Sequence, residues 1–179
     1  MLSPKEKIYT VADIYNLPDG QRAELIDGKI YNMAPPSRIH QRIVLSLSRK
    51  LADYVEHNHK ECEVDIAPFA VFLNKDDYNY LEPDVSVICD QSKLDDRGCN
   101  GSPDFIIEVV SPSTMRMDYL IKMRKYMSSG VRLYWIVNPQ DESVTVYDFE
   151  HDEYGRYHFE EPVPVSICDG LRIIIGESV

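Results

Sequence analysis

The sequence lacks a hydrophobic run long enough to cross a lipid bilayer, which takes about 20 consecutive apolar residues. Its first 15 residues carry charges and contain no apolar segment of the signal-peptide type. We therefore expect a cytoplasmic protein. The sequence also lacks a CxxC pair, which argues against a zinc site or a disulfide framework. We expect four reduced, structural cysteines, namely Cys62, Cys89, Cys99 and Cys168.

Basic residues are scarce. The chain has 19 Lys and Arg against 30 Asp and Glu, a formal net charge of -11. Because neutralising phosphates requires Lys and Arg, this balance argues against tight, sequence-independent nucleic-acid binding by the whole surface. A local basic strip beside a metal-loaded acidic site can still face a phosphate, since a bound ion reverses the local field.

Internal repeats, low-complexity tracts and domain linkers are also absent from the sequence. The chain has 179 residues, of which 44% are hydrophobic and 27% charged. This length is enough for one domain to bury a sizeable core, and two independent domains of this total size are not expected. We predict a single globular domain over residues 1–179.

The stretch that organises the chain is residues 102–130, and its centre is Glu108. This carboxylate is set in the apolar run 105–110, which is typical of a strand buried on both faces. An unpaired anion in such a layer costs roughly several kcal/mol, so we expect a cation, a metal or a proton beside it. The helix predicted after this strand carries two candidate partners, Asp118 and Lys122.

The remaining elements follow from periodicity and turn residues. Asp27-Gly28 between two short alternating runs predicts a hairpin over 22–33. Apolar residues at helical spacing predict a helix over 38–57, and Gly130 suits the left-handed cap of a helix over 115–127. The other predictions are a short helix at 11–16, a polar loop at 90–102, and strands at 63–73 (with a proline at 68, hence at an edge or bulged), 85–89, 133–138, 143–149, 154–160 and 171–175.

In this order of elements, some consecutive strands are joined by hairpins and others by a helix. Strands joined by hairpins are antiparallel, whereas a helical crossover joins parallel strands. The sequence therefore predicts an α/β (α+β) protein in which helices flank a mixed β-sheet core.

Two carboxylates are candidates for a metal site. Asp84 precedes the strand at 85–89 and Glu108 lies within the next predicted long strand. If these strands are neighbours, as short connections favour, both carboxylates reach one point, which is how proteins normally hold magnesium. Each residue also has a purely structural interpretation. Asp84 could be a turn residue after a proline, and Glu108 could belong to a structural ion pair.

Lys122 stands four residues after Asp118, so the two share one face of the predicted helix. By helical phase this face is offset from the apolar residues of the same helix. A lysine here could orient an attacking water or stabilise charge on a phosphate. The alternative is a solvated helix pair, worth about 0.3 kcal/mol.

Several segments together resemble the Uma2 family of restriction endonucleases, a branch of the PD-(D/E)xK nuclease superfamily. They are EPDVSVI, SPDFIIEVVSPST, D-x-x-x-K-x-x-x-Y at Asp118, Lys122 and Tyr126, GVRLYWIVNP, and the earlier YTVADIYNLPDG and AELIDGKIYNMAPPSRIH. The resemblance implies a restriction-endonuclease-like αβββαβ core with an N-terminal β-hairpin and extra C-terminal strands. It also implies Mg²⁺-dependent cleavage of DNA phosphodiesters, with Mn²⁺ as a substitute.

The resemblance assigns roles to individual residues. Asp84 matches the aspartate of the PD motif and Glu108 the acidic residue of the (D/E)xK motif, which makes them the implied metal ligands. Val110 stands where the wider superfamily has its lysine, and Lys122 matches the lysine that Uma2-like sequences carry on the next helix.

Two further polar residues match the family's front end and are implied to complete the site, Glu24 from the hairpin and His40 from the start of the helix at 38–57. Each also has an ordinary interpretation, Glu24 as an exposed hairpin residue and His40 as a first-turn residue without chemistry. Tyr126 is more typical of a core position than of a site.

Three functions stay open at this point. The first is a metal-dependent endonuclease acting on DNA, for which a homodimer is expected because a single-site enzyme needs two active sites to cut both strands. The second is a catalytically silent nuclease-fold interaction or DNA-associated module, which the charge of -11 and Val110 favour. The third is a metal-dependent hydrolase of a small phosphate ester.

Overall fold

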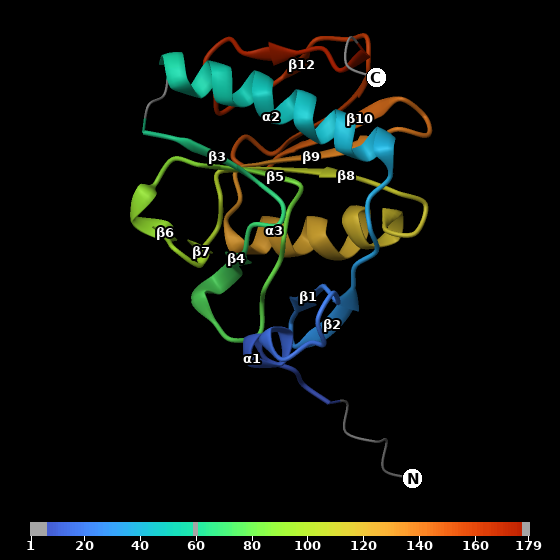
Figure 1. Cartoon of the computed structure of the whole chain (residues 1–179). Helices are drawn as coiled ribbons and strands as arrows, with labels where there is room; N and C mark the ends of the chain where they lie inside the picture. The colour runs from blue at the N-terminus through green and yellow to red at the C-terminus, as the bar shows by residue number, and fades with distance from the viewer. Residues whose placement is uncertain (1–6, 59–60, 177–179) are drawn as a thin grey trace.

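A mixed sheet of six strands forms the centre of the computed structural model, which describes residues 7–58 and 61–176 (Figure 1). The strand order across this sheet is β11-β10-β9-β8-β5-β3. The β8–β9 pair is parallel and the other neighbours are antiparallel. The strands are β3 (Glu63–Ile66), β5 (Val85–Ile88), β8 (Phe105–Val109), β9 (Leu133–Asn138), β10 (Ser143–Asp148) and β11 (Glu153–His158).

Helices cover both faces of this sheet (Figure 1). One face carries α2 (Arg38–Asn58), and the other carries a continuous helix made of the π-helical segment η3 (Met117–Lys122) and α3 (Met123–Ser129). In chain order α2, β3, β5, β8, η3 with α3, and β9 form the αβββαβ core that was expected. The prediction of a mixed sheet flanked by helices is therefore confirmed.

Smaller elements surround this core. The predicted hairpin is present, with its turn at Asp27 and Gly28, where φ is 49° and 75°. The segment 90–102, which was predicted as a polar loop, contains two short strands. The smaller elements that surround the core are α1 (Val11–Tyr15), β1 (Ala23–Ile26), β2 (Lys29–Asn32), β4 (Val71–Phe72), η1 (Leu73–Lys75), η2 (Gln91–Lys93), β6 (Leu94–Asp95), β7 (Gly98–Asn100), β12 (Val163–Pro164) and β13 (Arg172–Ile173).

Strand β8 is buried on both faces, as its apolar run predicts. Its odd-numbered residues pack in the cluster that includes α2, and Ile106 packs in the cluster on the α3 side. Because side chains alternate along a strand, Glu108 faces the same side as Ile106. The lone carboxylate of this strand therefore lies in the layer between the sheet and the η3–α3 helix.

The strand predicted over 63–73 is divided in two. Strand β3 ends before Pro68 and forms an edge of the central sheet, whereas β4 pairs with β7 in a separate small sheet. Because proline has no backbone N–H, it cannot continue a ladder of hydrogen bonds. An edge position was one of the two predicted alternatives, the other being a bulge, but the change of sheet was not predicted.

The expectation of four reduced cysteines is wrong for two of them. Cys62 and Cys89 form a disulfide, with Cα atoms 3.8 Å apart. The β3–β5 register pairs Glu63 with Ile88, so continuing it by one residue places the two cysteines opposite each other. Sequence spacing does not reveal a pair brought together by strand pairing. Cys99 and Cys168 are free and buried.

Within the described residues, no helix is both long enough and apolar enough to pass through a membrane. The longest helix, α2, has 21 residues, but its apolar side chains form a single stripe. This stripe, which includes Ile43, Leu47 and Leu51, packs on the central sheet. The helix is thus a cover for the sheet, with polar residues on its outer side.

Candidate active site

Asp84 and Glu108 lie side by side on neighbouring strands. Strands β5 and β8 pair antiparallel with Val85 opposite Ile107, and continuing this register by one residue places Asp84 opposite Glu108. Directly opposed residues point to the same face of a sheet, with Cβ atoms about 5 Å apart. Oδ2 of Asp84 also accepts a hydrogen bond from the backbone N–H of Val109 at 2.7 Å. The expectation that the two strands are neighbours is confirmed.

Glu108 is buried, with 4% of its surface exposed. Its Oε1 atom accepts hydrogen bonds from Nζ of Lys122 at 2.9 Å and from Oη of Tyr126 at 2.7 Å. Burial raises the pKa of Glu108 well above its usual range, and the opposing effect of the Lys122 ammonium does not cancel that rise. The strand carboxylate therefore has the cationic partner that its burial requires.

Lys122 is the centre of the cluster. Its Nζ atom lies 2.9 Å from Oε2 of Glu24, 2.9 Å from Oε1 of Glu108 and 3.5 Å from Oδ1 of Asp118. Burial alone would lower the pKa of Lys122, but the three carboxylates outweigh it and raise that pKa well above its usual range. Lys122 and Asp118 are both buried, so the interpretation as a solvated helix pair is wrong.

The helix that carries these residues is not a regular α-helix. Residues Met117–Lys122 form a π-helical segment, which continues as α3 and ends at Gly130 with a left-handed φ of 92°, as predicted. Residues four apart share one face of an α-helix, and they stay on one face through the π-helical segment, whose hydrogen bonds run to the fifth residue. Asp118, Lys122 and Tyr126 accordingly all contribute to the same cluster.

The hairpin and α2 each add one residue to the site. Glu24 on β1 has both carboxylate oxygens engaged: Oε1 accepts from the backbone N–H of Glu82 at 3.1 Å, and Oε2 contacts Lys122. His40, in the first turn of α2, places Nε2 3.1 Å from Oδ2 of Asp84. The structure therefore brings together all five residues predicted for the site.

The cluster carries an excess of negative charge. Its four carboxylates and one lysine give a net formal charge of −3 when the imidazole is neutral. Burial raises the pKa of Asp118 as well, with Lys122 opposing the rise. Excess buried negative charge favours uptake of protons or of a cation. The acidic residues are Glu24, Asp84, Glu108 and Asp118.

The donor set fits a magnesium ion. Within the described residues, neither Oδ1 of Asp84 nor Oε2 of Glu108 has a hydrogen bond or an ion pair, so each carboxylate retains one oxygen for a metal. Magnesium is typically bound through one or two carboxylates, with water and phosphate completing its octahedron. Over the same part of the chain, no group of three or more His, Cys, Asp or Glu side chains is arranged to hold a metal.

Tyr126 is the residue whose role sequence reasoning missed, because its pattern is that of a core aromatic. Its ring is buried against Tyr134, but its hydroxyl donates to Glu108. Tyr126→Phe is expected to lower the free energy of unfolding by about 1.5–3 kcal/mol, the usual range for a hydrogen bond to a charged group. Chemical denaturation followed by circular dichroism measures this loss.

The matched control is Tyr134→Phe, because the Tyr134 hydroxyl is also buried but donates to a neutral carbonyl, that of Asp118, at 3.1 Å. A smaller loss of about 0.5–1.5 kcal/mol is expected there. Equal losses in the two variants would contradict a charge-assisted bond to Glu108.

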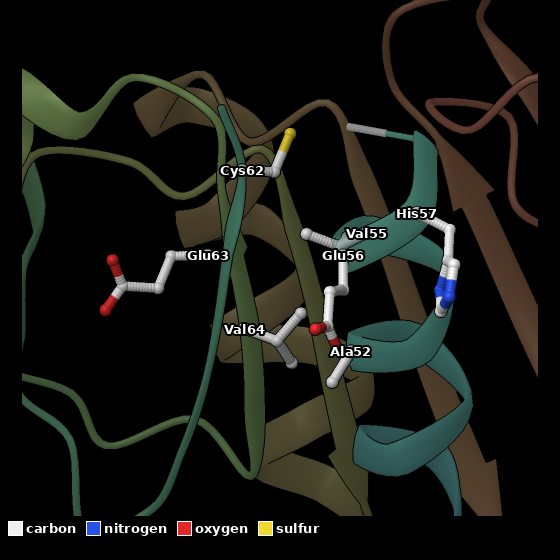
Figure 2. A pocket seen from close by; sticks show the side chains of 7 residues that line it. All are labelled: Ala52, Val55, Glu56, His57, Cys62, Glu63 and Val64. Carbon is white, nitrogen blue, oxygen red and sulfur yellow. The ribbon is translucent and has the colours of Figure 1, made fainter. Parts of the chain in front are cut away.

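A hollow of about 660 Å³ lies elsewhere, between the end of α2 and β3 (Figure 2). Its lining residues are Ala52, Val55, Glu56, His57, Cys62, Glu63 and Val64. None of the predicted site residues lines it. A helix rises about 1.5 Å per residue, so His57 is displaced by roughly 25 Å along α2 from His40. The hollow and the carboxylate cluster are therefore separate features.

A family model covers nearly the whole chain, and two relatives cover about two thirds to three quarters of it. The family model Uma2, described as "Putative restriction endonuclease", matches residues 11–175. Two relatives from Synechocystis sp. (strain ATCC 27184 / PCC 6803 / Kazusa) are each 28% identical. Uncharacterized protein slr1290 aligns over 133 residues, which are 74% of this chain and 68% of that protein. Uncharacterized protein sll1609 aligns over 122 residues, which are 66% of this chain and 67% of that protein.

A solved structure shares the fold. It is the 1.96 Å crystal structure of a "putative nuclease belonging to DUF820" from Anabaena variabilis ATCC 29413. The TM-score is 0.75, and the match covers 94% of this chain and 96% of that one, at 21% sequence identity. At this identity the likeness shows the fold alone.

Proposed function

The chain belongs to the Uma2 family, described as putative restriction endonucleases, and we propose that it is a metal-dependent endonuclease that hydrolyses DNA phosphodiester bonds. The observation that carries the proposal is the opposition of Asp84, directly before β5, and Glu108 on β8, each with one oxygen free of described contacts. The excess negative charge around them supports it further, because it favours a divalent cation.

Asp84 and Glu108 would hold Mg²⁺, or Mn²⁺ in its place, through Oδ1 and Oε2. The ion would polarise a phosphoryl oxygen and lower the pKa of a bound water. The protein's own contribution is orientation. Lys122 and Tyr126 hold Oε1 of Glu108, and His40 holds Oδ2 of Asp84 together with a backbone N–H.

Lys122 is proposed to orient the attacking water. Two of its contacts are short, whereas the contact with Asp118 is the longest at 3.5 Å. Of the three N–H groups of Lys122, the one that faces Asp118 is therefore best placed to donate a hydrogen bond to a water instead. Glu24 has both oxygens engaged, so its proposed role is electrostatic support of Lys122 rather than metal binding.

Calorimetric titration with Mg²⁺, and then with Mn²⁺, tests the proposed metal site. The wild-type protein is expected to bind the ion, and Asp84→Asn is expected to lose that binding because it removes one of the two charged ligands. Asp90→Asn is the matched control, since Asp90 is exposed and bonds to Ser92, away from the cluster. Equal binding by wild type and Asp84→Asn, or none by either, would count against the site.

The alternative is a catalytically silent nuclease-fold interaction or DNA-associated module. It is favoured by the contacts of Lys122, whose ammonium faces three carboxylates as in a structural ion-pair network. Under this alternative, Lys122→Ala lowers the stability of the protein but leaves every measurable activity of the folded protein unchanged. A hydrolase of small phosphate esters would instead turn over a chromogenic phosphodiester and leave plasmid DNA intact.

A further inference from the structure

Charge is unevenly distributed along the chain. Residues 28–52 contain no Asp or Glu, although the whole chain has 30. The same segment holds five basic residues of the chain's 19. They are Lys29, Arg38, Arg42, Arg49 and Lys50. A segment of one sign in a chain of net charge -11 indicates a local surface that differs from the rest of the molecule.

Three of these residues share the outer face of α2. Arg38, Arg42 and Arg49 are four and seven residues apart, a spacing that returns to one side of a helix, and all three are exposed. The opposite side of α2 packs on the sheet, so the arginines point away from the core. We call these three residues the arginine stripe.

Among the residues that the structure describes, the arginines of the stripe have no carboxylate partner. Over the described residues, none of the three makes a hydrogen bond or an ion pair with a carboxylate. Other exposed arginines do, such as Arg156 with Asp141 and Arg132 with Glu150. Unpaired guanidinium groups keep their full capacity for bidentate hydrogen bonds to an anion.

The stripe begins at the end of α2 that carries His40. The Nε2 atom of His40 contacts Asp84 at 3.1 Å, so this end of the helix adjoins the proposed active site. His40 is two residues from both Arg38 and Arg42, and two residues turn a helix by about 200°, so the stripe lies on the opposite side of α2 from the His40 side chain. Helix α2, which carries the stripe, lies across one face of the central sheet (Figure 1). From Arg38 to Arg49, eleven steps of about 1.5 Å give the stripe a length of roughly 16 Å. Toward the end of the helix the charge changes sign, at Asp53 and Glu56.

We propose that the arginine stripe binds the phosphate backbone of duplex DNA on one side of the scissile bond. The inference rests on the proposed nuclease function, which places the scissile phosphodiester at Asp84 and Glu108. With roughly 3.4 Å of helix axis per nucleotide along one strand, a 16 Å stripe would span about five phosphates. The contacts carry no sequence information, because they are made to the backbone.

An anionic membrane fits the stripe less well. Helices that bind membrane surfaces insert an apolar face, whereas the apolar face of α2 is buried against the sheet. Every residue of α2 is described, and Leu45, 57% exposed, is the only large apolar side chain exposed on this helix. Nucleic acid therefore accounts better for a face of three arginines on a helix whose first turn adjoins the carboxylate site.

Fluorescence anisotropy with a labelled, mixed-sequence DNA duplex in EDTA tests the stripe. We compare wild type, Arg42→Gln/Arg49→Gln, and the matched control Arg97→Gln/Arg156→Gln, which removes the same charge from exposed arginines elsewhere. Arg38 is left in place because it adjoins His40. The stripe variant is expected to bind about tenfold more weakly at low salt, with the slope of log K against log salt reduced by about 1.8, whereas the control stays near wild type.

Three results would overturn the inference: no binding by the wild type at the lowest salt, equal weakening of the stripe and control variants, or loss of binding to anionic vesicles in the stripe variant while its DNA binding is kept. The last would assign the stripe to a membrane. Because EDTA removes cleavage from the assay, a protein that binds DNA through the stripe and never cuts would overturn the proposed function alone.

Discussion

Replacing Glu108 with glutamine is expected to lower the rate of metal-dependent DNA cleavage by about a thousandfold, which corresponds to roughly 4 kcal/mol of transition-state stabilisation. Glutamine keeps an oxygen that accepts from Lys122 and Tyr126, the two donors at Oε1. What it removes is the negative charge at the oxygen proposed to hold the metal. The substitution therefore separates the charge of Glu108 from its packing.

Initial rates of plasmid nicking at saturating Mg²⁺ measure this effect. Glu63→Gln is the matched control, because Glu63 is exposed on the edge strand β3 and lies outside the cluster. Circular dichroism establishes that both variants are folded. A Glu108→Gln protein that keeps a tenth or more of the wild-type rate would show that Glu108 does not bind a catalytic metal.

Replacing Lys122 with methionine is expected to lower the free energy of unfolding by about 3–5 kcal/mol, the cost of removing one partner from a buried ion pair. The ammonium is the only lysine or arginine cation within 4 Å of Glu24, Glu108 or Asp118 among the described residues. Without it, three carboxylates share a buried layer. The same variant should also lose DNA cleavage, because the proposed water-orienting donor is gone.

Chemical denaturation measures the stability change, with Lys125→Met as the matched control on the same helix. Lys125 pairs with Asp27, whose side chain is 70% exposed, so its loss should cost about 1 kcal/mol or less. Adding Glu24→Gln to Lys122→Met should recover part of the loss, because one uncompensated charge is removed. A Lys122→Met protein as stable as the control would contradict the account of the cluster.

An excess of buried acid around a single lysine is not what stability alone would favour. Replacing buried ion pairs by well-packed apolar residues is often neutral or stabilising. Buried groups with strongly shifted pKa values, such as Glu108 and Lys122, gather at functional sites more often than elsewhere. The composition of the cluster therefore supports the proposal that it is a site of chemistry.

Much of the core could be predicted from local sequence. The apolar run around Glu108 predicts a strand buried on both faces, and β8 is one. The strands next to Asp84 and around Glu108 were expected to be neighbours, and β5 pairs with β8, although residues 89–104 between them form the small elements η2, β6 and β7. The Asp27-Gly28 turn and the Gly130 cap were also predicted correctly, because both depend on the residues at the turn itself.

Other features depend on contacts between residues far apart in the sequence. The spacing of Asp118 and Lys122 is the same in a solvated pair and in a buried one, so it could not reveal their burial. Nothing in the sequence indicated the π-helical segment that carries them. The disulfide of Cys62 and Cys89 follows from the β3–β5 register, which no local pattern specifies.

The most direct test is incubation of the wild-type protein with supercoiled and with single-stranded circular DNA, at low salt, in Mg²⁺ and then in Mn²⁺. Low salt matters because the few phosphate contacts of a chain with net charge -11 are screened early. The account predicts cleavage that requires the added metal, stops with EDTA and is absent from a parallel preparation of Glu108→Gln. No cleavage by the wild type, or equal cleavage by both preparations, would contradict it.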